Sequence, residues 1–484
     1  MFRQKTKIQK VGLVIGLILF ILVSFILPEN KITSQSIAGG VTLLMAVWWI
    51  TEAIPIYYTS CVPLIVFPFS AIYSNNYIEN FFYVIIPYLD PYIFLFAGGM
   101  CIAAAMQQWN LHKRISLQIL SFIGTQPSRL LFGFLVSTAF ISLWISNTAT
   151  ATMMLPIAMA VILQLESKQK KRLSFYGAAI ALSIAYASNI GGIGTKIGTA
   201  PNMQLTMFMH DKGIDITFLQ FMAIGLPFVI MLLPVAWFTL WQIGKKDLLE
   251  NLDNEFIKQE LRELGSIKKE EKIVLVVFLI TALLWMFGKP ITDFMQIYFQ
   301  TKKITSAHVE GSTAVLAAVF LFLFRSEKRF ILEFHSLKTV PWGTLVLLGG
   351  GLAMASAIQQ SKLTDLWATN LSGIKNFTPF LQILFVSLIT VSMSAVTSNT
   401  ATVGVMLPLL YSISDQNNFV PILFASTISA SCDFALPAGT PPNAIVFGSG
   451  YITIPQMVKS GIVLDIFSAI LAAIWSWGII RFII

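Results

Sequence analysis

The chain has 484 residues, of which 56% are hydrophobic and 11% charged, and its formal net charge is +9. A soluble domain has about 25% charged residues, so this composition excludes an ordinary soluble protein and indicates an all-α polytopic membrane protein. In such a chain the positive charge is expected in cytoplasmic loops, so a nucleic-acid partner is not predicted.

The N-terminal segment carries four basic side chains within its first ten residues, followed by an apolar run from Val11 to Leu27. The run is long for a signal peptide, and no small-residue cleavage site follows it. We therefore expect residues 1–35 to form a cytoplasmic tail and a first membrane-spanning helix, with the N-terminus in the cytoplasm. Glu52 follows the next apolar segment and is expected to cap or brace the turn at Pro55, with a direct functional role as the alternative.

A short polar motif occurs twice. Ser-Asn-Thr-Ala-Thr at 146–150 and at 398–402 runs on to Met-Leu-Pro, and eight of the twelve positions in 146–157 and 398–409 are identical. Each copy interrupts a long apolar run, which indicates a helix broken inside the membrane with polar groups aimed at a bound ion or solute. Packing of small residues between helices is the alternative, but it does not require a matched Asn at membrane depth.

Two glycine features also recur. Phe-Ala-Gly-Gly-Met at 96–100 has a counterpart 252 residues later at 348–352, and these glycines suit either a re-entrant hairpin or a glycine-lined helix interface. Gly-Thr-(Ala/Pro)-Pro-Asn begins at Gly198 and again at Gly439. Each copy follows an apolar helix, so we expect both helices to stop within the membrane and leave backbone carbonyls and amides free.

Residues 244–272 form the strongly charged segment of the chain and hold 15 charged side chains of mixed sign. Apolar residues recur there at roughly helical spacing, which predicts an amphipathic helix at the cytoplasmic face. These residues are Leu249, Leu252, Phe256, Leu261 and Leu264. We interpret the segment as a linker between a first repeat, 36–243, and a second repeat, 273–484.

The orientation of the repeats follows from the first helix, which runs outward. If each repeat crosses the membrane an odd number of times, the two repeats are inverted and the C-terminus is external. Inverted repeats whose broken helices meet near the midplane are typical of secondary transporters.

Three motifs together closely resemble the divalent anion:sodium symporters, which carry dicarboxylates, citrate or sulfate. They are the paired Ser-Asn-Thr motifs, Trp-Trp-Ile-Thr-Glu-Ala-Ile-Pro at 48–55, and Thr-Pro-Pro-Asn-Ala-Ile-Val-Phe-Gly at 440–448. The resemblance extends from about residue 36 to the end of the chain. It implies a homodimer in the bilayer of a bacterial inner membrane, with a fixed scaffold and an elevator-type transport domain that contains the hairpins and the Ser-Asn-Thr helices.

The resemblance also implies two sodium sites and one substrate site. The first sodium would be held by Ser142, Ser146, Asn147 and the carbonyl of Gly198 or Gly194. The second would be held by Ser394, Thr397, Ser398, Asn399 and the carbonyl of Gly439. The substrate would meet Ser146, Asn147, Thr148, Thr199, Ser398, Asn399, Thr400, Thr440 and Pro441. Ser142 and Ser394 are 252 residues apart, as the motifs are, so the internal repeat supports this pairing.

The chemistry of these residues agrees with that assignment. Sodium is a hard cation that takes oxygen ligands, and hydroxyls, amide oxygens and free carbonyls supply them. A dicarboxylate needs donors, which Asn and Thr side chains and helix N-termini provide. Because neither motif contains Arg, bound sodium ions must supply most of the positive charge, which makes substrate affinity depend on sodium and produces symport.

Lys196 and Asp433 depart from the pattern expected of relatives. The simplest interpretation is that Lys196 extends to the cytoplasmic interface and that Asp433 caps a helix. The sharper hypotheses are that the two residues pair with each other, or that Lys196 is a tethered cation that replaces a sodium ion.

The most plausible function is sodium-coupled import of a C4-dicarboxylate. A sodium-independent dicarboxylate exchanger and a sulfate or citrate symporter remain alternatives, and a channel fits paired occluded sites less well. The three cysteines and four histidines are scattered without ligand spacing, and the chain shows no nucleophile–base pair. We therefore do not predict an enzyme, and sodium as the coupling ion is the only cofactor expected.

Overall fold

The computed structural model describes residues 6–26, 33–247, 254–326, 329–363, 377–415 and 418–483. These residues are almost entirely helical, and a two-stranded antiparallel ribbon of β1 (Arg325–Ser326) and β2 (Arg329–Phe330) is the one sheet among them. Six helices of the described chain are long and apolar enough to cross a membrane, or seven if α14 and α15, which meet at an angle of 66°, form one bent span. The first of these spans, Lys7–Ile26, confirms the predicted N-terminal helix.

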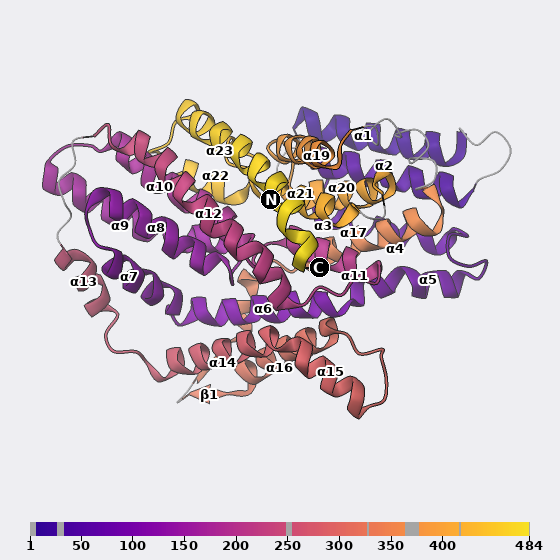
Figure 1. The fold of residues 1–484 in the computed structure, drawn as a ribbon, viewed down its shortest axis with the longest axis horizontal. Helices are drawn as coiled ribbons and strands as arrows, with labels where there is room; N and C mark the ends of the chain where they lie inside the picture. The colour runs from indigo at the N-terminus through magenta and orange to yellow at the C-terminus, as the bar shows by residue number, and fades with distance from the viewer. Residues whose placement is uncertain are drawn as a thin grey trace.

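Most of the N-terminal part packs along one side of the molecule, on the right in Figure 1, and its last helix runs from there across the lower middle. Its elements are α1 (Lys7–Ile21), η1 (Leu22–Ile26), α2 (Ser34–Thr51), α3 (Ile56–Thr59), α4 (Val62–Val66), η2 (Phe67–Phe69), α5 (Tyr77–Ile85), η3 (Ile86–Leu89) and α6 (Pro91–Gln108). Helix α1 starts at a capping box between Thr6 and Gln9, in which each side chain bonds the backbone N–H of the other residue. Helix α2 ends at Glu52, which adopts a left-handed conformation with φ 47° and confirms the expected turn before Pro55.

The glycine-rich segments at 96–100 and 348–352 are not hairpin turns. Helix α6 continues through Gly98, and α17 (Gly343–Gln360) continues through Gly350. A Cβ at Gly98 would overlap the backbone of Ala314, and a Cβ at Gly350 would overlap the backbone of Ser60. The glycines therefore serve close helix contacts, which is the alternative that the sequence left open.

The middle of the chain contains a helical hairpin and a broken helix. Its elements are α7 (Leu111–Ile123), α8 (Pro127–Ser142), α9 (Asn147–Gln169), α10 (Ser174–Gly192), α11 (Ala200–Asp211) and α12 (Phe218–Gly244). Pro127 at the start of α8 accepts a hydrogen bond from Tyr176 near the start of α10, and Ser142 at the end of α8 meets Ser188 near the end of α10. Glu166 near the end of α9 accepts a bond from Leu173 just before α10, so α8 and α9 run in opposite directions and turn at 143–146.

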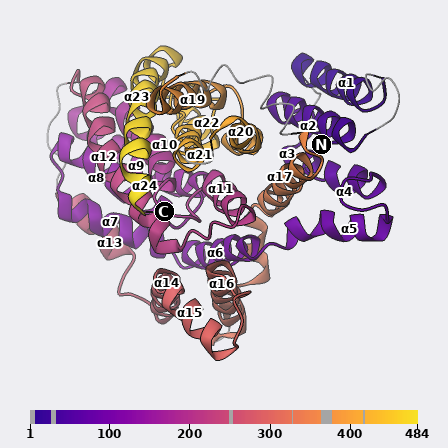
Figure 2. The same cartoon turned by 45° about the vertical axis from the view of Figure 1, so that its right-hand side comes forward.

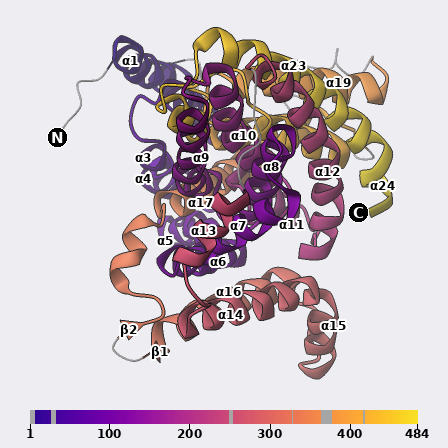
Figure 3. The same cartoon turned by 90° about the vertical axis from the view of Figure 1, so that its left-hand side faces the viewer.

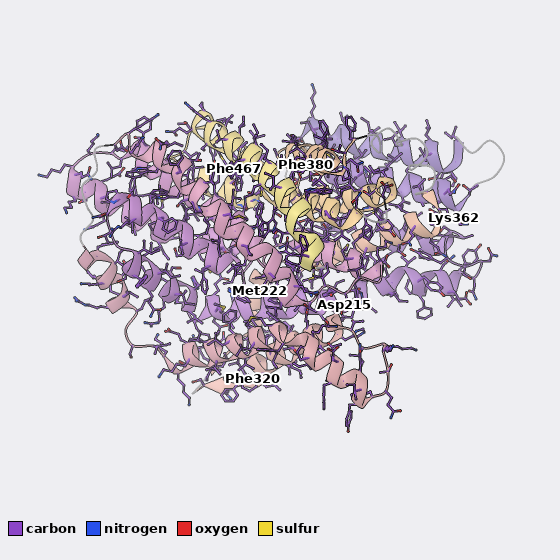
Figure 4. The ribbon with its side chains drawn as sticks, viewed as in Figure 1. Asp215, Met222, Phe320, Lys362, Phe380 and Phe467 are labelled. Atoms are coloured by element: carbon purple, nitrogen blue, oxygen red, sulfur yellow. The ribbon has the colours of Figure 1, made fainter. Side chains whose placement is uncertain are left out.

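A layer of helices lies against α6, along the lower edge of the molecule in Figures 1 and 2. It consists of α14 (Lys269–Met286), α15 (Gly288–Tyr298) and α16 (Ser306–Leu323), and α16 packs closely on α6. Asp215, in the connection before α12, links this layer to α6. Its carboxylate accepts hydrogen bonds from the amide of Ser306 on α16 at 2.9 Å and from the hydroxyl of Tyr92 on α6 at 3.0 Å. Figure 3 shows the same layer from the side, below the α8–α12 group, which it contacts where the ring of Trp285 on α14 stacks on that of Phe218 on α12 at 5.2 Å.

Part of the predicted linker helix is present as α13 (Asn254–Glu263). Phe256, Leu261 and Leu264 pack against the main core, and Lys113 of α7 lies 2.9 Å from Glu260. The predicted positions Leu249 and Leu252 lie outside the described residues.

The C-terminal part repeats the hairpin and the broken helix. Its elements are η4 (Phe334–Thr339), α17, α19 (Pro379–Ser394), α20 (Asn399–Ile413), α21 (Phe419–Ser431), α22 (Pro441–Phe447), α23 (Ile454–Trp475), η6 (Ser476–Ile480) and α24 (Arg481–Ile483). Helix α19 packs beside α21, as α8 packs beside α10. Phe320 on α16 and Phe467 on α23 are exposed at opposite edges of the molecule, as expected for helices that face lipid.

Candidate functional site

The first Ser-Asn-Thr motif forms the turn of the α8–α9 hairpin. Ser146 is the residue before α9, and Asn147 is the first residue of that helix. The Ser142 hydroxyl lies 3.0 Å from Asn147 Oδ1 and 2.7 Å from the carbonyl oxygen of Ser188 on α10. The hairpin turn is thus held against the end of α10, which fixes the direction of the Asn147 side chain.

The second motif has the same local geometry. Ser398 precedes α20, and the Ser394 hydroxyl lies 2.9 Å from Asn399 Oδ1 and 2.7 Å from the carbonyl oxygen of Ala430 on α21. Ser142 and Ser394 are therefore equivalent positions of the repeat, as predicted, since each makes the same contact with the Asn of its own motif. The Thr397 hydroxyl points elsewhere, to the carbonyl of Met393 at 2.9 Å and the hydroxyl of Thr402 at 2.6 Å.

Both helices predicted to break do so. Residues 193–199, which we call the first tip, separate α10 from α11, and residues 432–440, the second tip, separate α21 from α22. Asn202 donates from Nδ2 to the carbonyls of Gly192 at 2.9 Å and Thr195 at 2.7 Å. Asn443 donates from Nδ2 to Asp433 at 3.2 Å and Leu436 at 3.0 Å. One Asn at the start of each following helix thus satisfies carbonyls that the break leaves free.

Asn189 connects the two halves of the site. Its Nδ2 donates to Thr440 Oγ1 and to the carbonyl of Asp433, each at 3.2 Å, and its Oδ1 accepts from Asn147 Nδ2 at 3.4 Å. The first Ser-Asn-Thr motif is therefore linked to the second tip through one buried amide. No sequence motif singled out Asn189, which lies within α10, just before the first tip.

A cavity of about 640 Å³ lies where the two motifs and the two tips meet. Eleven of the predicted site residues line it, namely Ser146, Asn147, Thr148, Gly198, Thr199, Ser398, Asn399, Thr400, Gly439, Thr440 and Pro441. Ser142 and Ser394 lie behind the cavity wall and position Asn147 and Asn399. Gly194 and Thr397 are not among the lining residues either, and a Cβ at Gly194 would overlap the side chain of Leu143.

The opposite wall contains residues that the sequence did not assign to the site. Gln107 of α6, Thr344 of α17 and Glu52 at the end of α2 line the cavity there. Glu52 therefore combines the predicted structural role with a position on the wall. Only for Glu52 did the sequence carry a signal, because a carboxylate next to an apolar run is costly unless it reaches water or protein.

The electrostatics of the cavity favour an anion only when cations are also bound. No Lys, Arg or His of the described chain lines it, and Glu52 is its one charged lining residue. Helices α9, α11 and α20 begin at the wall, so their N-terminal dipoles face the cavity. Hydroxyl, amide and carbonyl oxygens make up its polar surface, and such a set suits a hard monovalent cation.

Lys196 neither extends to the cytoplasmic interface nor pairs with Asp433. Its side chain is fully buried, so it does not extend to the interface, and its Nζ lies 2.7 Å from Glu310 Oε2 on α16 and not against Asp433. The ring of Tyr92 lies 4.8 Å from the same Nζ. Glu310 Oε1 also accepts a hydrogen bond from the Phe218 amide at 2.8 Å. Burial drives this arrangement, because an amine inside the protein needs a counter-charge.

Asp433 is not a helix cap. It is fully buried, and neither of its carboxylate oxygens has a hydrogen-bond partner in the described part of the chain. Thr440 is the residue that caps α22, since its side chain accepts from the Asn443 amide at 3.3 Å. The expectation that Asp433 caps a helix is therefore wrong.

Comparisons with known proteins agree with the fold and identify the family. Residues 7–484 match the family model described as "Sodium:sulfate symporter transmembrane region". The chain is similar to the "Sodium-dependent dicarboxylate transporter SdcS" of Staphylococcus saprophyticus, with 36% identity over 477 residues that cover 96% of this chain and 89% of the relative. The protein of the same name from Staphylococcus aureus (strain USA300) is 37% identical over 480 residues, with the same coverage.

A solved structure supports the fold alone. The crystal structure of the Alcanivorax borkumensis YdaH transporter, described as having an unusual topology, aligns with a TM-score of 0.55 and 14% identity. The alignment covers 90% of this chain and 98% of that one. Together with the family match over nearly the whole length, these findings show that the chain is an integral membrane protein that belongs to the sodium:sulfate symporter family.

Proposed function

We propose that the protein imports a C4-dicarboxylate together with sodium ions. The single observation that carries the proposal is the cavity that both Ser-Asn-Thr motifs and both tips line, with no basic side chain among the described lining residues. A dianion placed there meets amide and hydroxyl donors and three helix N-termini, but no fixed positive charge. Two or more sodium ions must then neutralise it, so binding of the anion and of sodium becomes mutually dependent.

The sodium positions we propose follow from the oxygen-rich corners of the cavity. At the first corner Ser146, Asn147 and the carbonyl of Gly198 would hold one ion, with Ser142 orienting Asn147. At the second corner Ser398, Asn399 and the carbonyl of Gly439 would hold another, with Ser394 in the matching role. Thr148, Thr199, Thr400, Thr440 and Pro441 lie between these corners and would meet the substrate carboxylates.

The names of the relatives support dicarboxylate as the substrate class, because the two Staphylococcus proteins are called sodium-dependent dicarboxylate transporters. We extend the proposal to a homodimer whose two inverted repeats move the site across the bilayer as an elevator. The repeated hairpin and broken helix supply the paired half-sites that such a mechanism uses.

Uptake into proteoliposomes tests the proposal. Labelled succinate, malate, citrate and sulfate are offered with an inward sodium gradient, and again with choline in place of sodium. We expect uptake of a four-carbon dianion that requires the sodium gradient. Equal uptake in choline would contradict sodium coupling, and accumulation of sulfate alone would contradict the substrate class.

The charge moved per cycle is a second test. If more than two sodium ions accompany a dianion, net positive charge enters, and each such charge gains about 2.3 kcal/mol per 100 mV of membrane potential. We expect an inside-negative potential, imposed with potassium and valinomycin, to increase succinate uptake. An equal rate of succinate uptake with and without the imposed membrane potential would indicate electroneutral transport.

A further inference from the structure

The second tip contains a carboxylate without a partner. Asp433 lies just after α21 and is completely buried. Its main-chain carbonyl accepts bonds from Asn189 and Asn443, whereas both side-chain oxygens are unsatisfied within the described chain. A buried carboxylate that lacks both a hydrogen bond and a counter-charge is strongly unfavourable, so Asp433 requires a group that balances its charge.

Within the described chain no side chain supplies that group. The ionisable groups that act on Asp433 from the surrounding elements are Asp465 of α23, Tyr186 of α10 and the adjacent Cys432. None of them is a cation. Asp465 adds a second negative charge, and its Oδ1 already accepts the Phe434 amide at 2.9 Å. The two acids therefore create a negative region inside the second tip that a bound cation or a proton would balance.

A second buried oxygen without a hydrogen-bond partner in the described chain lies on α22, directly after the second tip. Asn443 uses its Nδ2 to bond the carbonyls of Asp433 and Leu436, which leaves its buried Oδ1 without a partner. Acceptor oxygens that face no donor are what a hard cation requires as ligands. The carboxylate of Asp433 also fills the space that a Cβ on Gly439 would need, and Gly439 lines the cavity.

The first tip shows what this position contacts. Gly192 corresponds to Asp433, because each contacts the glycine of its own tip, Gly198 or Gly439, and the carbonyl of each accepts a hydrogen bond from the following Asn. A Cβ at Gly192 would overlap Asn147 Oδ1. A side chain at Gly192 would therefore be directed at the first Ser-Asn-Thr motif, where the sodium ion of that half is proposed to bind.

We propose that Asp433 is a carboxylate ligand of the sodium ion bound at the second tip. This inference rests on the proposed sodium coupling. It makes the two sodium positions unequal, because the first uses neutral oxygens alone and the second contains a fixed negative charge. The second position then binds sodium more tightly and fills first, before the substrate arrives.

Sodium binding without substrate tests the assignment. The melting temperature of the purified protein in detergent is followed while sodium chloride replaces choline chloride at constant ionic strength. Wild type is compared with Asp433→Asn and Asp433→Ala. A ligand that binds only the folded state stabilises it by RT ln(1 + [L]/Kd), so the rise of the melting temperature with sodium concentration gives the Kd for sodium. We call this Kd, the sodium concentration at half-occupancy, the sodium midpoint, and we expect it to rise at least about tenfold in both variants, which corresponds to about 1.4 kcal/mol.

Melting in sodium-free buffer and a control variant at another buried carboxylate separate loss of a sodium ligand from a general loss of stability. In sodium-free buffer both variants should melt at or above the wild-type temperature, because each removes an uncompensated buried charge. Asp247→Asn is the matched control, since Asp247 is also a buried carboxylate but bonds the amides of Phe175 and Tyr176. It should lower the melting temperature and leave the sodium midpoint unchanged.

The results that would overturn the Asp433 assignment differ from those that would overturn the proposed sodium coupling. If wild type responds to sodium and both Asp433 variants have the same midpoint, Asp433 is not a ligand and the proposal is overturned, while sodium coupling stands. If Asp433→Asn changes only the pH dependence of melting, a proton balances the charge and the proposal is again overturned. If wild type itself does not respond to sodium but responds to succinate, the proposed function fails and the inference fails with it.

Discussion

The first and second tips have the same framework but opposite charge. In each, an Asn of the following helix bonds the free carbonyls, and a Ser-Asn-Thr hairpin packs against the preceding helix. The first tip carries Lys196, which Glu310 neutralises at 2.7 Å. The second tip carries Asp433, whose carboxylate has no partner in the described chain. The comparison shows that a repeated polar framework can hold two sites that differ electrostatically.

The difference also concerns what each tip is attached to. Lys196 joins the first tip to α16, in the layer of helices beneath α6, and Glu310 also accepts the amide of Phe218 at the start of α12. The positive charge of Lys196 is therefore used for packing and does not face the cavity. In the second tip the charge is directed at Gly439, on the cavity wall.

Removing either motif amide should have the largest effect. We expect Asn147→Ala and Asn399→Ala each to reduce sodium-driven succinate uptake to the background of empty vesicles, because each removes a proposed ligand of both sodium and substrate. The measurement is initial uptake by equal amounts of folded, reconstituted protein. Asn76→Ala is the control, since Asn76 caps α5 away from the cavity and should cost only about 1 kcal/mol of stability. Normal uptake by either motif variant would refute the site.

Breaking the buried ion pair should have the next largest effect, on stability. Lys196→Met leaves Glu310 buried without its counter-charge, and removal of one partner of such a pair costs about 3–5 kcal/mol. The double variant Lys196→Met/Glu310→Gln removes both charges and retains an acceptor for the Phe218 amide, so it should recover most of that loss. Thermal unfolding in detergent gives both values.

The exposed pair Lys289–Asp293, at 3.7 Å, serves as control for that experiment. Lys289→Met should change stability by less than about 1 kcal/mol. If Lys196→Met is equally mild, the ion pair does not secure the first tip. If its sodium midpoint for uptake also rises, Lys196 acts as a tethered cation, contrary to the geometry.

The glycines of the two tips should respond differently to one added methyl group. Ala at Gly198 would overlap the backbone of Gly192, whereas Ala at Gly439 would overlap the side chain of Asp433. We expect each substitution to cost about 1–3 kcal/mol as overpacking. The second loss alone should be relieved by Asp433→Ala, because a side chain can be removed and a backbone cannot. Melting temperatures in sodium-free buffer test this, and an equal loss in Gly439→Ala with and without Asp433→Ala would contradict it.

The serine contacts should have the smallest effect. Ser142→Ala and Ser394→Ala each remove a hydroxyl that bonds a neutral oxygen, so each should cost about 1 kcal/mol of stability. Because these serines position Asn147 and Asn399, we also expect weaker apparent sodium affinity in uptake assays. Ser392→Ala, whose exposed hydroxyl bonds only its own helix, should change neither quantity. Different sodium shifts for the two site variants would show which half-site depends more on this contact.

The sequence by itself determined the class, the repeat and the breaks. Low charge and long apolar runs indicate a membrane protein wherever the chain folds, because hydrocarbon rejects charge. The helix breaks at Gly198 and Gly439 were predictable since each has its own local signal, namely Gly and Pro around a polar Asn. The same holds for eleven of the cavity residues, which lie within or beside the repeated motifs.

Only the tertiary structure decided what depends on a distant partner. A run of glycines permits both a turn and a close helix contact, and it was Ala314 across the interface that made Gly98 a contact. The partner of Lys196 is 114 residues away on a helix with no motif, so no local pattern points to Glu310. Asn189 and the unpartnered state of Asp433 likewise result from how the two halves pack. A hydrogen bond or ion pair is a property of two positions in space, and the sequence specifies their separation only through the whole fold.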